Sequence, residues 1–335
     1  MNKKRLIILI CAASLLMAVI LLGGCSLLAG LTGGKPTVTV DVFWDTGRLQ
    51  NVTRLTDDGQ PKRMPRISPD GKMMLYGEQQ NNQWNIILLR DVTVPAKTPL
   101  ASNAFNPAWY ANNNNFVYVT REAGSTRIVR SATAGGGRTY VTRNPVGDND
   151  DFPSIRGEVV LFQTYTSGKW QIASMRDNGT EVTFLGDGET PSWHPTEPKF
   201  LFVRRPSANE SSKIYEMDLA SLQVTEIFSD SDYHSRFPSY SADGRYILFQ
   251  KGAERVVTGT AVTRIGDAIT GSTRTTSTTN KWQIFIMRSD GSHLSTVTLD
   301  AVDSYHPCMD ANGYIYFISD ASGKSEIYRS RVNLD

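Results

Sequence analysis

Short apolar runs separated by polar turns recur along the chain from about residue 50 to its end. Runs such as FVYV, VVLF, FLFV, YILF and IYFI hold four consecutive aliphatic or aromatic residues, and alternating segments such as NIILL and KIYEMD follow them. The loops between them are rich in Gly, Asn and Asp. No segment after residue 36 keeps a helical period over enough turns. The pattern therefore predicts an all-β chain of short strands and hairpins.

The predicted strands are organised as six copies of one unit. Each copy opens on a proline, passes a polar turn and continues into an apolar run. The opening prolines are Pro65, Pro107, Pro153, Pro191, Pro238 and Pro307, which lie 42, 46, 38, 47 and 69 residues apart. Four of these five spacings are close to the length of a four-stranded propeller blade. Because one copy buries its faces only between neighbours, the repeat predicts a six-bladed β-propeller over residues 42–335.

The two ends of the repeat region are incomplete in complementary ways. The sixth copy supplies three strands before the chain stops, and its outer strand is missing. The segment NVTRLT, residues 51–56, reads as an outer strand with no copy in front of it. We therefore expect Val52–Thr56 to pair with the strand around Ile327–Ser330 and to close the ring. The preceding segment TVTVDVFW also resembles a strand, but the repeat gives it no place.

One copy is longer than the others. Blade five holds an insertion over residues 251–281 between its second and third strands. The alternation in RVVTGTAVTRI favours a hairpin, and the Gly, Ser and Thr content of the tail equally favours a mobile loop. Long loops in compact domains are often functional, so we expect this insertion to contact a partner.

The N-terminus carries a targeting signal. Lys3, Lys4 and Arg5 precede an apolar run over residues 6–22, and LLGGC ends at Cys25. This order predicts a signal peptide over residues 1–24, lipidation of Cys25 and a flexible tether over residues 25–41. An uncleaved membrane anchor is the alternative. Ser26, in place of an aspartate, resembles lipoproteins sent to the outer membrane, so we expect a lipid-anchored protein of the bacterial envelope that faces the periplasm.

Charge and cysteine content narrow the class of function. The chain has 35 Lys and Arg against 33 Asp and Glu, and three of the basic residues leave with residues 1–25. The mature chain then has 32 basic and 33 acidic residues, a net charge of −1, which argues against nucleic-acid binding. Cys11 and Cys25 belong to the N-terminal segment, so Cys308 has no partner for an internal disulfide. A closed propeller needs no second copy, and we expect a monomer.

The turn motifs resemble those of a known family. Ser68-Pro69-Asp70-Gly71-Lys72 and the equivalent SADGR at 241–245 resemble the WD40-like repeat of TolB-type propellers, as do RLTDDG at 54–59 and IMRSDGS at 286–292. The resemblance covers residues 50–335. It implies a binding scaffold whose partners are envelope proteins, either Tol-Pal-like proteins or other lipoproteins. TolB carries an α/β domain before its propeller, whereas this chain has no segment between Gly30 and Asn51 that could form one, so we expect a TolB-like lipoprotein.

Acidic residues gather in the connections that lead from outer to inner strands. Symmetry should bring these connections together at one end of the central channel, where they would focus a negative potential. Such a channel mouth suits a basic peptide or a hard cation such as calcium; no other cofactor is expected. The alternative is that these residues only form soluble turns. The candidate residues are Asp57, Asp58, Asp148, Asp150, Asp151, Asp187, Glu189, Asp230, Asp232, Asp300 and Asp303, with His234 beside them.

Enzyme motifs are mostly absent from the sequence. There is no H-E-x-x-H, no P-loop and no G-x-S-x-G elbow. The alternative to a non-catalytic scaffold is a glycan-active or metal-dependent propeller lyase or hydrolase. It would need the channel histidines and a carboxylate to converge, but His194 and His306 occupy different repeat positions. Trp109, Trp193 and Tyr240 could stack on sugars or pack between blades.

Overall fold

The computed structural model describes residues 48–334, except 143–144, 208–209, 253–256, 266–267, 278–280 and 299–301. The signal peptide over 1–24, Cys25, the tether over 25–41 and Asp300 lie outside these residues. All regular elements in the described part of the chain are strands. Accordingly, it contains no helix long and apolar enough to cross a membrane.

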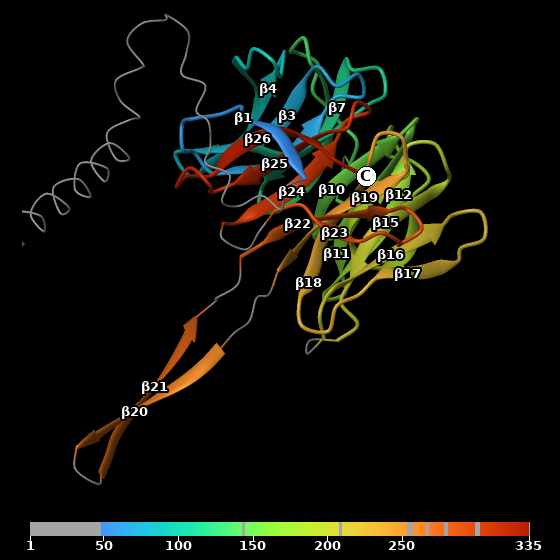
Figure 1. Ribbon diagram of the computed structural model, residues 1–335. Coiled ribbons are helices and arrows are strands. Elements are labelled where there is room, and N and C mark those ends of the chain that lie inside the picture. Colours follow the sequence, from blue (N-terminus) through green and yellow to red (C-terminus); the bar gives the residue numbers. More distant parts are fainter. Residues whose placement is uncertain are drawn as a thin grey trace, which may run out of the picture. The chain divides into compact units, whose positions relative to one another are not determined.

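The strands form six antiparallel four-stranded sheets arranged in a ring, which confirms the predicted six-bladed β-propeller (Figure 1). Blade 1 contains β2 (Lys62–Ile67), β3 (Met74–Gln80), β4 (Gln83–Leu89) and β5 (Lys97–Ser102). Blade 2 contains β6 (Ala104–Trp109), β7 (Asn115–Glu122), β8 (Ser125–Ala132) and β9 (Thr139–Tyr140). Blade 3 contains β10 (Asn149–Arg156), β11 (Val159–Thr166), β12 (Lys169–Arg176) and β13 (Thr183–Asp187).

The remaining three blades follow the same plan. Blade 4 contains β14 (Glu189–Trp193), β15 (Lys199–Arg204), β16 (Lys213–Asp218) and β17 (Val224–Phe228). Blade 5 contains β18 (His234–Tyr240), β19 (Tyr246–Gly252), β22 (Gln283–Arg288) and β23 (Ser295–Thr296). Blade 6 contains β24 (Ser304–Met309), β25 (Tyr314–Ser319), β26 (Glu326–Val332) and β1 (Leu49–Arg54).

The ring closes through the strand that the sequence predicted. In blade 6, β1 pairs with β26 in the register Thr53↔Arg329 and Arg54↔Tyr328. The amide of Leu55 extends the pairing by donating to the carbonyl of Ile327 at 2.8 Å. Figure 1 shows β1, in blue, beside β26, in red. Two segments almost 280 residues apart in the chain therefore share one sheet.

The insertion in blade 5 contains a hairpin. Strands β20 (Val257–Ile265) and β21 (Ala268–Ser277) pair with each other in antiparallel register, from Val257↔Ser277 to Ile265↔Ala268. They form a two-stranded sheet of their own, and β19 pairs directly with β22. Whether this hairpin contacts a partner stays a prediction.

The core lies between neighbouring blades. Met74 and Tyr76 of β3 pack against Tyr316 and Ile318 of β25, and all four are fully buried. Each such side chain stabilises the fold by roughly 1.5–3 kcal/mol relative to exposure. Trp109 belongs to the cluster between blades 1 and 2. The aromatic residues at this repeat position therefore pack between blades, as one of the two sequence interpretations expected.

The two most similar motifs form the same turn. Ser68 Oγ donates to Asp70 Oδ1 at 2.6 Å and accepts the amide of Met73 at 2.8 Å. In the second copy Ser241 makes the same pair of bonds, at 2.6 and 3.0 Å. The glycine after each aspartate has a φ of 74°, a left-handed conformation that glycine adopts without steric strain. The serine, aspartate and glycine of the motif therefore all serve the turn between the inner and second strands.

Every inner strand contains a bulge at its proline. The residue before each proline has a left-handed φ of 47–53°, and the register to the second strand shifts there in all six blades. These residues are Met64, Asn106, Phe152, Thr190, Phe237 and His306. Such a conformation is strained for residues other than glycine, so the surrounding sheet must hold it. For example, Gln163 and Gln250 accept the amides of Thr190 and His306 at 2.7 and 3.0 Å.

Candidate functional site

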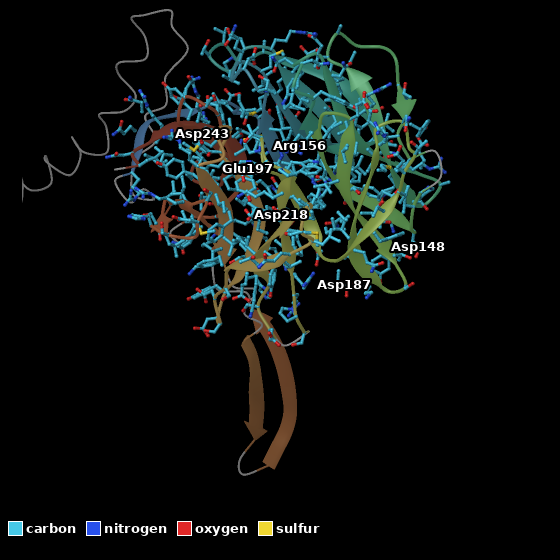
Figure 2. The ribbon with its side chains drawn as sticks, turned by 90° about the vertical axis from the view of Figure 1, so that its right-hand side faces the viewer. Asp148, Arg156, Asp187, Glu197, Asp218 and Asp243 are labelled. Atoms are coloured by element: carbon cyan, nitrogen blue, oxygen red, sulfur yellow. The ribbon has the colours of Figure 1, made fainter. Side chains whose placement is uncertain are left out.

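The two ends of the ring carry different connections. Because each blade is antiparallel, the outer-to-inner and second-to-third connections lie at one end, which we call the loop face. The inner-to-second and third-to-outer connections lie at the other end, the turn face. In Figure 2 Asp148 and Asp187 lie toward one end of the ring, and Arg156, Glu197 and Asp243 lie toward the other.

Four of the acidic residues predicted for the loop face lie beside a lysine. The ammonium of each lysine is within 3.1 Å of a carboxylate oxygen, so much of the negative charge expected there is balanced locally. The pairs are Asp58 with Lys62 (2.7 Å), Asp187 with Lys169 (2.8 Å), Asp230 with Lys251 (2.8 Å) and Asp303 with Lys281 (3.1 Å).

Two further predicted carboxylates are integrated into the structure of blade 3. Asp150 is completely buried, and it accepts bonds from the amide of Val146 at 2.9 Å and from Thr164 Oγ1 at 2.8 Å. Asp151 accepts Asn106 Nδ2 at 2.6 Å. Burial raises the pKa of both carboxyls, although these hydrogen bonds oppose the shift. The bonds of Asp150 hold the connection that leads into β10.

The remaining loop-face candidates differ in exposure. Asp57, Asp148 and Asp232 are exposed, and each lies in a different connection between blades. Glu189 is partly buried at the start of β14, and burial raises its pKa. His234 Nδ1 accepts the amide of Ser212 at 2.9 Å. Asp58 and Asp187 are exposed as well but lie beside lysines, so three exposed carboxylates of the described set remain outside the lysine pairs.

The loop face also contains a pocket that the sequence analysis missed. A cavity of about 510 Å³ is lined by Arg63, Trp84, Phe105, Arg121 and Asp151, together with amide side chains. The Arg63 guanidinium lies 5.3 Å from the ring centre of Trp84 and 5.1 Å from that of Phe105. Burial lowers its pKa, and the charge of Asp151 opposes that shift. This part of the loop face is thus cationic and aromatic rather than acidic.

The channel narrows at the level of the prolines. The cavity there measures about 20 Å³ and is lined by residues of five inner strands, which leaves room for about one water molecule. His306 packs its ring edge-on against Phe237, with 4.5 Å between the ring centres. Burial, together with the charges of Arg63 and Arg66, holds its pKa well below the usual value. His306 is therefore neutral at pH 7.

Beyond this constriction the channel widens into a funnel of about 220 Å³ at the turn face. The residue that follows the proline lines this funnel in every blade. In chain order these residues are Arg66, Ala108, Ser154, Ser192, Ser239 and Cys308. Trp109, Trp193 and Tyr240 also contribute to the wall. Arg66 is the one charged residue at a repeat position that is otherwise occupied by small side chains.

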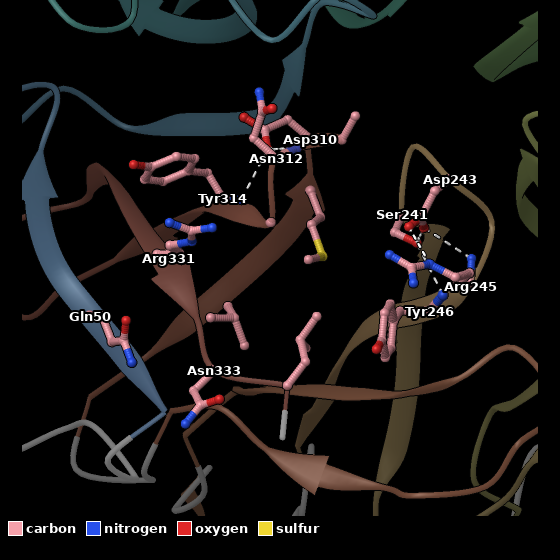
Figure 3. Close-up of a pocket in the computed structure, with 15 residues that line it drawn as sticks. Gln50, Ser241, Asp243, Arg245, Tyr246, Asp310, Asn312, Tyr314, Arg331 and Asn333 are labelled. Carbon is pink, nitrogen blue, oxygen red and sulfur yellow. Dashed lines mark hydrogen bonds and ion pairs between the residues drawn. The ribbon is translucent and has the colours of Figure 1, made fainter.

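A second hollow at the turn face lies between blades 5 and 6 and has a volume of about 820 Å³ (Figure 3). Asp243 accepts Arg245 Nε at 2.6 Å and the hydroxyl of Ser241. Asp310 accepts the amides of Asn312 and Tyr314 at 2.8 and 2.9 Å. The carboxylates of this hollow are therefore engaged in their own turns.

The four histidines occupy separate environments. His194 Nδ1 accepts the amide of Glu197 at 3.0 Å in a turn of blade 4, and His293 contacts Ser292 in blade 5. His306 packs against Phe237 of the constriction, and His234 lies at the loop face. In the part of the chain that the structure describes, no three or more His, Cys, Asp or Glu side chains lie close enough to hold a metal ion.

These observations define the class of the protein as a closed six-bladed β-propeller, and the solved structures similar to it give it a TolB-like fold. No family model matches the sequence, and no curated protein matches it. Among solved structures, a putative TolB from Agrobacterium tumefaciens is similar, with a TM-score of 0.59 and 14% identity over 84% of this chain and 97% of that one. TolB from Acinetobacter baumannii has a TM-score of 0.53 and 16% identity over 82% of this chain and 65% of that one.

An enzyme has a similar fold. An oligogalacturonate lyase from Vibrio parahaemolyticus has a TM-score of 0.51 and 12% identity over 84% of this chain and 94% of that chain. At such identities the likeness concerns the fold alone, and function has to be argued from the residues of this chain.

Proposed function

We propose that this chain is a non-catalytic binding scaffold of the bacterial cell envelope, anchored by a lipid on Cys25 after removal of residues 1–24. Residues 25–41 would be the tether and the propeller the binding module. The observation that carries the proposal is the set of exposed carboxylates, Asp57, Asp148 and Asp232, on the face that also bears the insertion over 251–281. The separate environments of the four histidines favour binding over metal-dependent catalysis.

The proposed partner is an envelope protein, Tol-Pal-like or another lipoprotein, that presents a basic segment to the loop face. Exposed carboxylates attract such a segment over about one Debye length, roughly 8 Å at physiological salt. The paired carboxylates Asp58, Asp187, Asp230 and Asp303 would keep their lysines and border the contact. Calcium at this face is the alternative occupant.

Crosslinking in the native envelope tests the proposed surface. The triple variant Asp57→Asn, Asp148→Asn and Asp232→Asn should lose the crosslinked partner. The matched control removes three exposed carboxylates of the turn face through Glu158→Gln, Glu181→Gln and Glu197→Gln, whose side chains are 73%, 69% and 56% exposed. Mass spectrometry identifies what is captured. Equal capture by both triple variants would refute a loop-face partner site.

Lipid attachment has its own test. Cys25→Ser should abolish incorporation of labelled palmitate and release the protein from the membrane fraction. If the wild-type protein instead retains residues 1–24, as terminal sequencing would show, the segment is an uncleaved anchor.

A glycan-active lyase is the second candidate. The guanidinium of Arg66 would suit an acidic sugar, and the small exposed parts of Trp109, Trp193 and Tyr240, which otherwise pack between blades, line the same funnel. Incubation of the chain with oligogalacturonate, with and without Mn²⁺, tests this activity. Formation of an unsaturated product would replace the scaffold proposal, whereas intact substrate would favour it.

A further inference from the structure

The funnel at the turn face departs from the six-fold repeat at one residue. Five blades place a small residue after the proline: Ala108, Ser154, Ser192, Ser239 and Cys308. Blade 1 places Arg66 there. The fold thus accepts serine at this position in three blades, and packing alone does not require a guanidinium.

The guanidinium of Arg66 has no counter-charge among the residues that the structure describes. Its hydrogen bond goes to the carbonyl of Pro65 at 3.3 Å, and it forms no salt bridge with any carboxylate of the described residues. The pKa of Arg66 is lowered by burial, and the Cys308 thiol is the ionisable group that opposes this. By contrast, the buried ammonium of Lys62 is paired with Glu326 at 3.0 Å. A partly buried cation without a partner is unfavourable, and this one lies where a ligand can reach it.

The size and walls of the funnel restrict what can enter. Its volume of about 220 Å³ is below the roughly 300–1,000 Å³ of ordinary small-molecule sites, so it suits one side chain or one chain end. Ser154 Oγ accepts the amide of Trp193 at 3.1 Å, which leaves the proton of this hydroxyl able to donate to a ligand. A guanidinium can donate two parallel bonds to a carboxylate.

We propose that this funnel binds a peptide carboxylate, either the C-terminus or an acidic side chain of a polypeptide, with Arg66 as its charged partner. The ligand enters from the turn face, opposite the acidic residues of the loop face. The aromatic wall covers the aliphatic part of the inserted residue, and Ser154 supplies a further hydrogen bond. The constriction of about 20 Å³ at the prolines stops the peptide from passing through the ring.

Calorimetric titration of the full chain in detergent tests this site. The probe is the dipeptide N-acetyl-Ala-Ala with a free C-terminal carboxylate, compared with its C-terminal amide. The free acid should bind saturably and the amide about tenfold or more weakly, because it removes the charge-assisted bonds. Arg66→Ser should abolish binding of the acid, and Arg66→Lys should keep part of it because the charge remains.

The matched control is Arg245→Ser, which removes a guanidinium at the turn face that is already paired with Asp243 at 2.6 Å; it should bind as the wild type does. Absence of saturable binding, or equal binding by Arg66→Ser, would overturn the proposal. Galacturonic acid forms the third arm. Its Arg66-dependent binding, without binding of the peptide acid, would overturn the peptide assignment in favour of an acidic sugar.

This inference does not depend on the lipid anchor or on the loop-face partner, because the probe is small and dissolved. If Arg66→Ser failed to fold, the acid–amide comparison on the unchanged chain would still decide the outcome. The two proposals can therefore fail separately.

Discussion

The two faces of this propeller use charged residues differently. At the loop face, carboxylates occur in most connections between blades, yet four of them lie beside lysines and two accept hydrogen bonds within the ring. At the turn face, the funnel contains one guanidinium, and it forms no ion pair within the described residues. A count of charges in the sequence would make the loop face the stronger binding surface. The pairing of those charges suggests that many of them stabilise the ring instead.

The clearest example is a buried cluster at the seam where the ring closes. Lys62 of β2 contacts Asp58 at 2.7 Å and Glu326 of β26 at 3.0 Å. Glu326 in turn accepts Thr56 Oγ1 and the amide of Gly59, both at 2.6 Å. The cluster joins blade 6, the connection after β1, and blade 1. Charged residues therefore reinforce the seam at which a propeller can open.

Lys62→Met should have the largest effect on stability. The side chains of Lys62 and Glu326 are 0% and 1% exposed, and removing one partner of a buried ion pair typically costs about 3–5 kcal/mol because the other charge stays buried. Urea unfolding measures the loss. The control is Arg176→Met at the turn face, whose side chain is 44% exposed and whose pairs with Glu158 and Glu181 are open to solvent. It should change stability by less than about 1 kcal/mol.

The double variant Lys62→Met with Glu326→Gln sharpens this prediction. Neutralising Glu326 as well removes the uncompensated charge, so the double variant should be more stable than Lys62→Met alone. If both variants lose the same free energy as the Arg176→Met control, the seam cluster does not stabilise the ring.

His306 lies between the two faces, and we expect its replacement to have an intermediate effect on the free energy of unfolding. The pKa of His306 is held well below its usual value by burial and by Arg63 and Arg66, so the unfolded chain binds a proton that the native state does not. Stability from this group is therefore present above about pH 6.5 and is lost as the pH falls toward the native pKa. The slope is limited to about 1.4 kcal/mol per pH unit for one proton.

His306→Gln tests this pH dependence. Unfolding free energies between pH 7.5 and 5 should fall less steeply in the variant than in the wild type. Asp150, Asp151 and Glu189 have raised pKa values, so their contribution to the unfolding free energy increases as the pH falls. This contribution is common to the variant and the wild type. Identical slopes would mean that His306 has the same pKa in the native ring as in the unfolded chain, so that burial does not lower it.

The sequence predicted the ring but not the pairing of its charges. The apolar runs and the six prolines defined the blades, and the two incomplete ends defined the closure between β1 and β26. In pairs such as Asp230 with Lys251, one partner lies in a connection between blades and the other on a strand, 21 residues apart. Such pairs depend on how the strands are placed beside the loops, which composition does not reveal. The left-handed backbone conformation of the residues before the prolines could not be predicted, because none of these six residues is a glycine.

The distinctive residue of the funnel could have been found from the sequence. Aligning the six copies on their prolines places Arg66 in one column with Ala108, Ser154, Ser192, Ser239 and Cys308. One charged residue among five small ones marks a departure from the repeat. That this column lines a cavity could not be predicted, because it depends on the bulge that every inner strand makes at its proline.

Arg66→Ser should have the smallest effect on stability. This variant distinguishes most directly between charged residues that stabilise the ring and a charged residue that binds a ligand. The substitution gives blade 1 the residue that blades 3, 4 and 5 have at the same position, and it removes a cation without a counter-charge. The lost packing of the arginine stem opposes this gain, so the unfolding free energy should change by less than about 1 kcal/mol. A loss as large as that of Lys62→Met would show that Arg66 supports the ring. The charged residues of both faces would then stabilise the fold, and the presence of Arg66 in the funnel would no longer indicate a ligand.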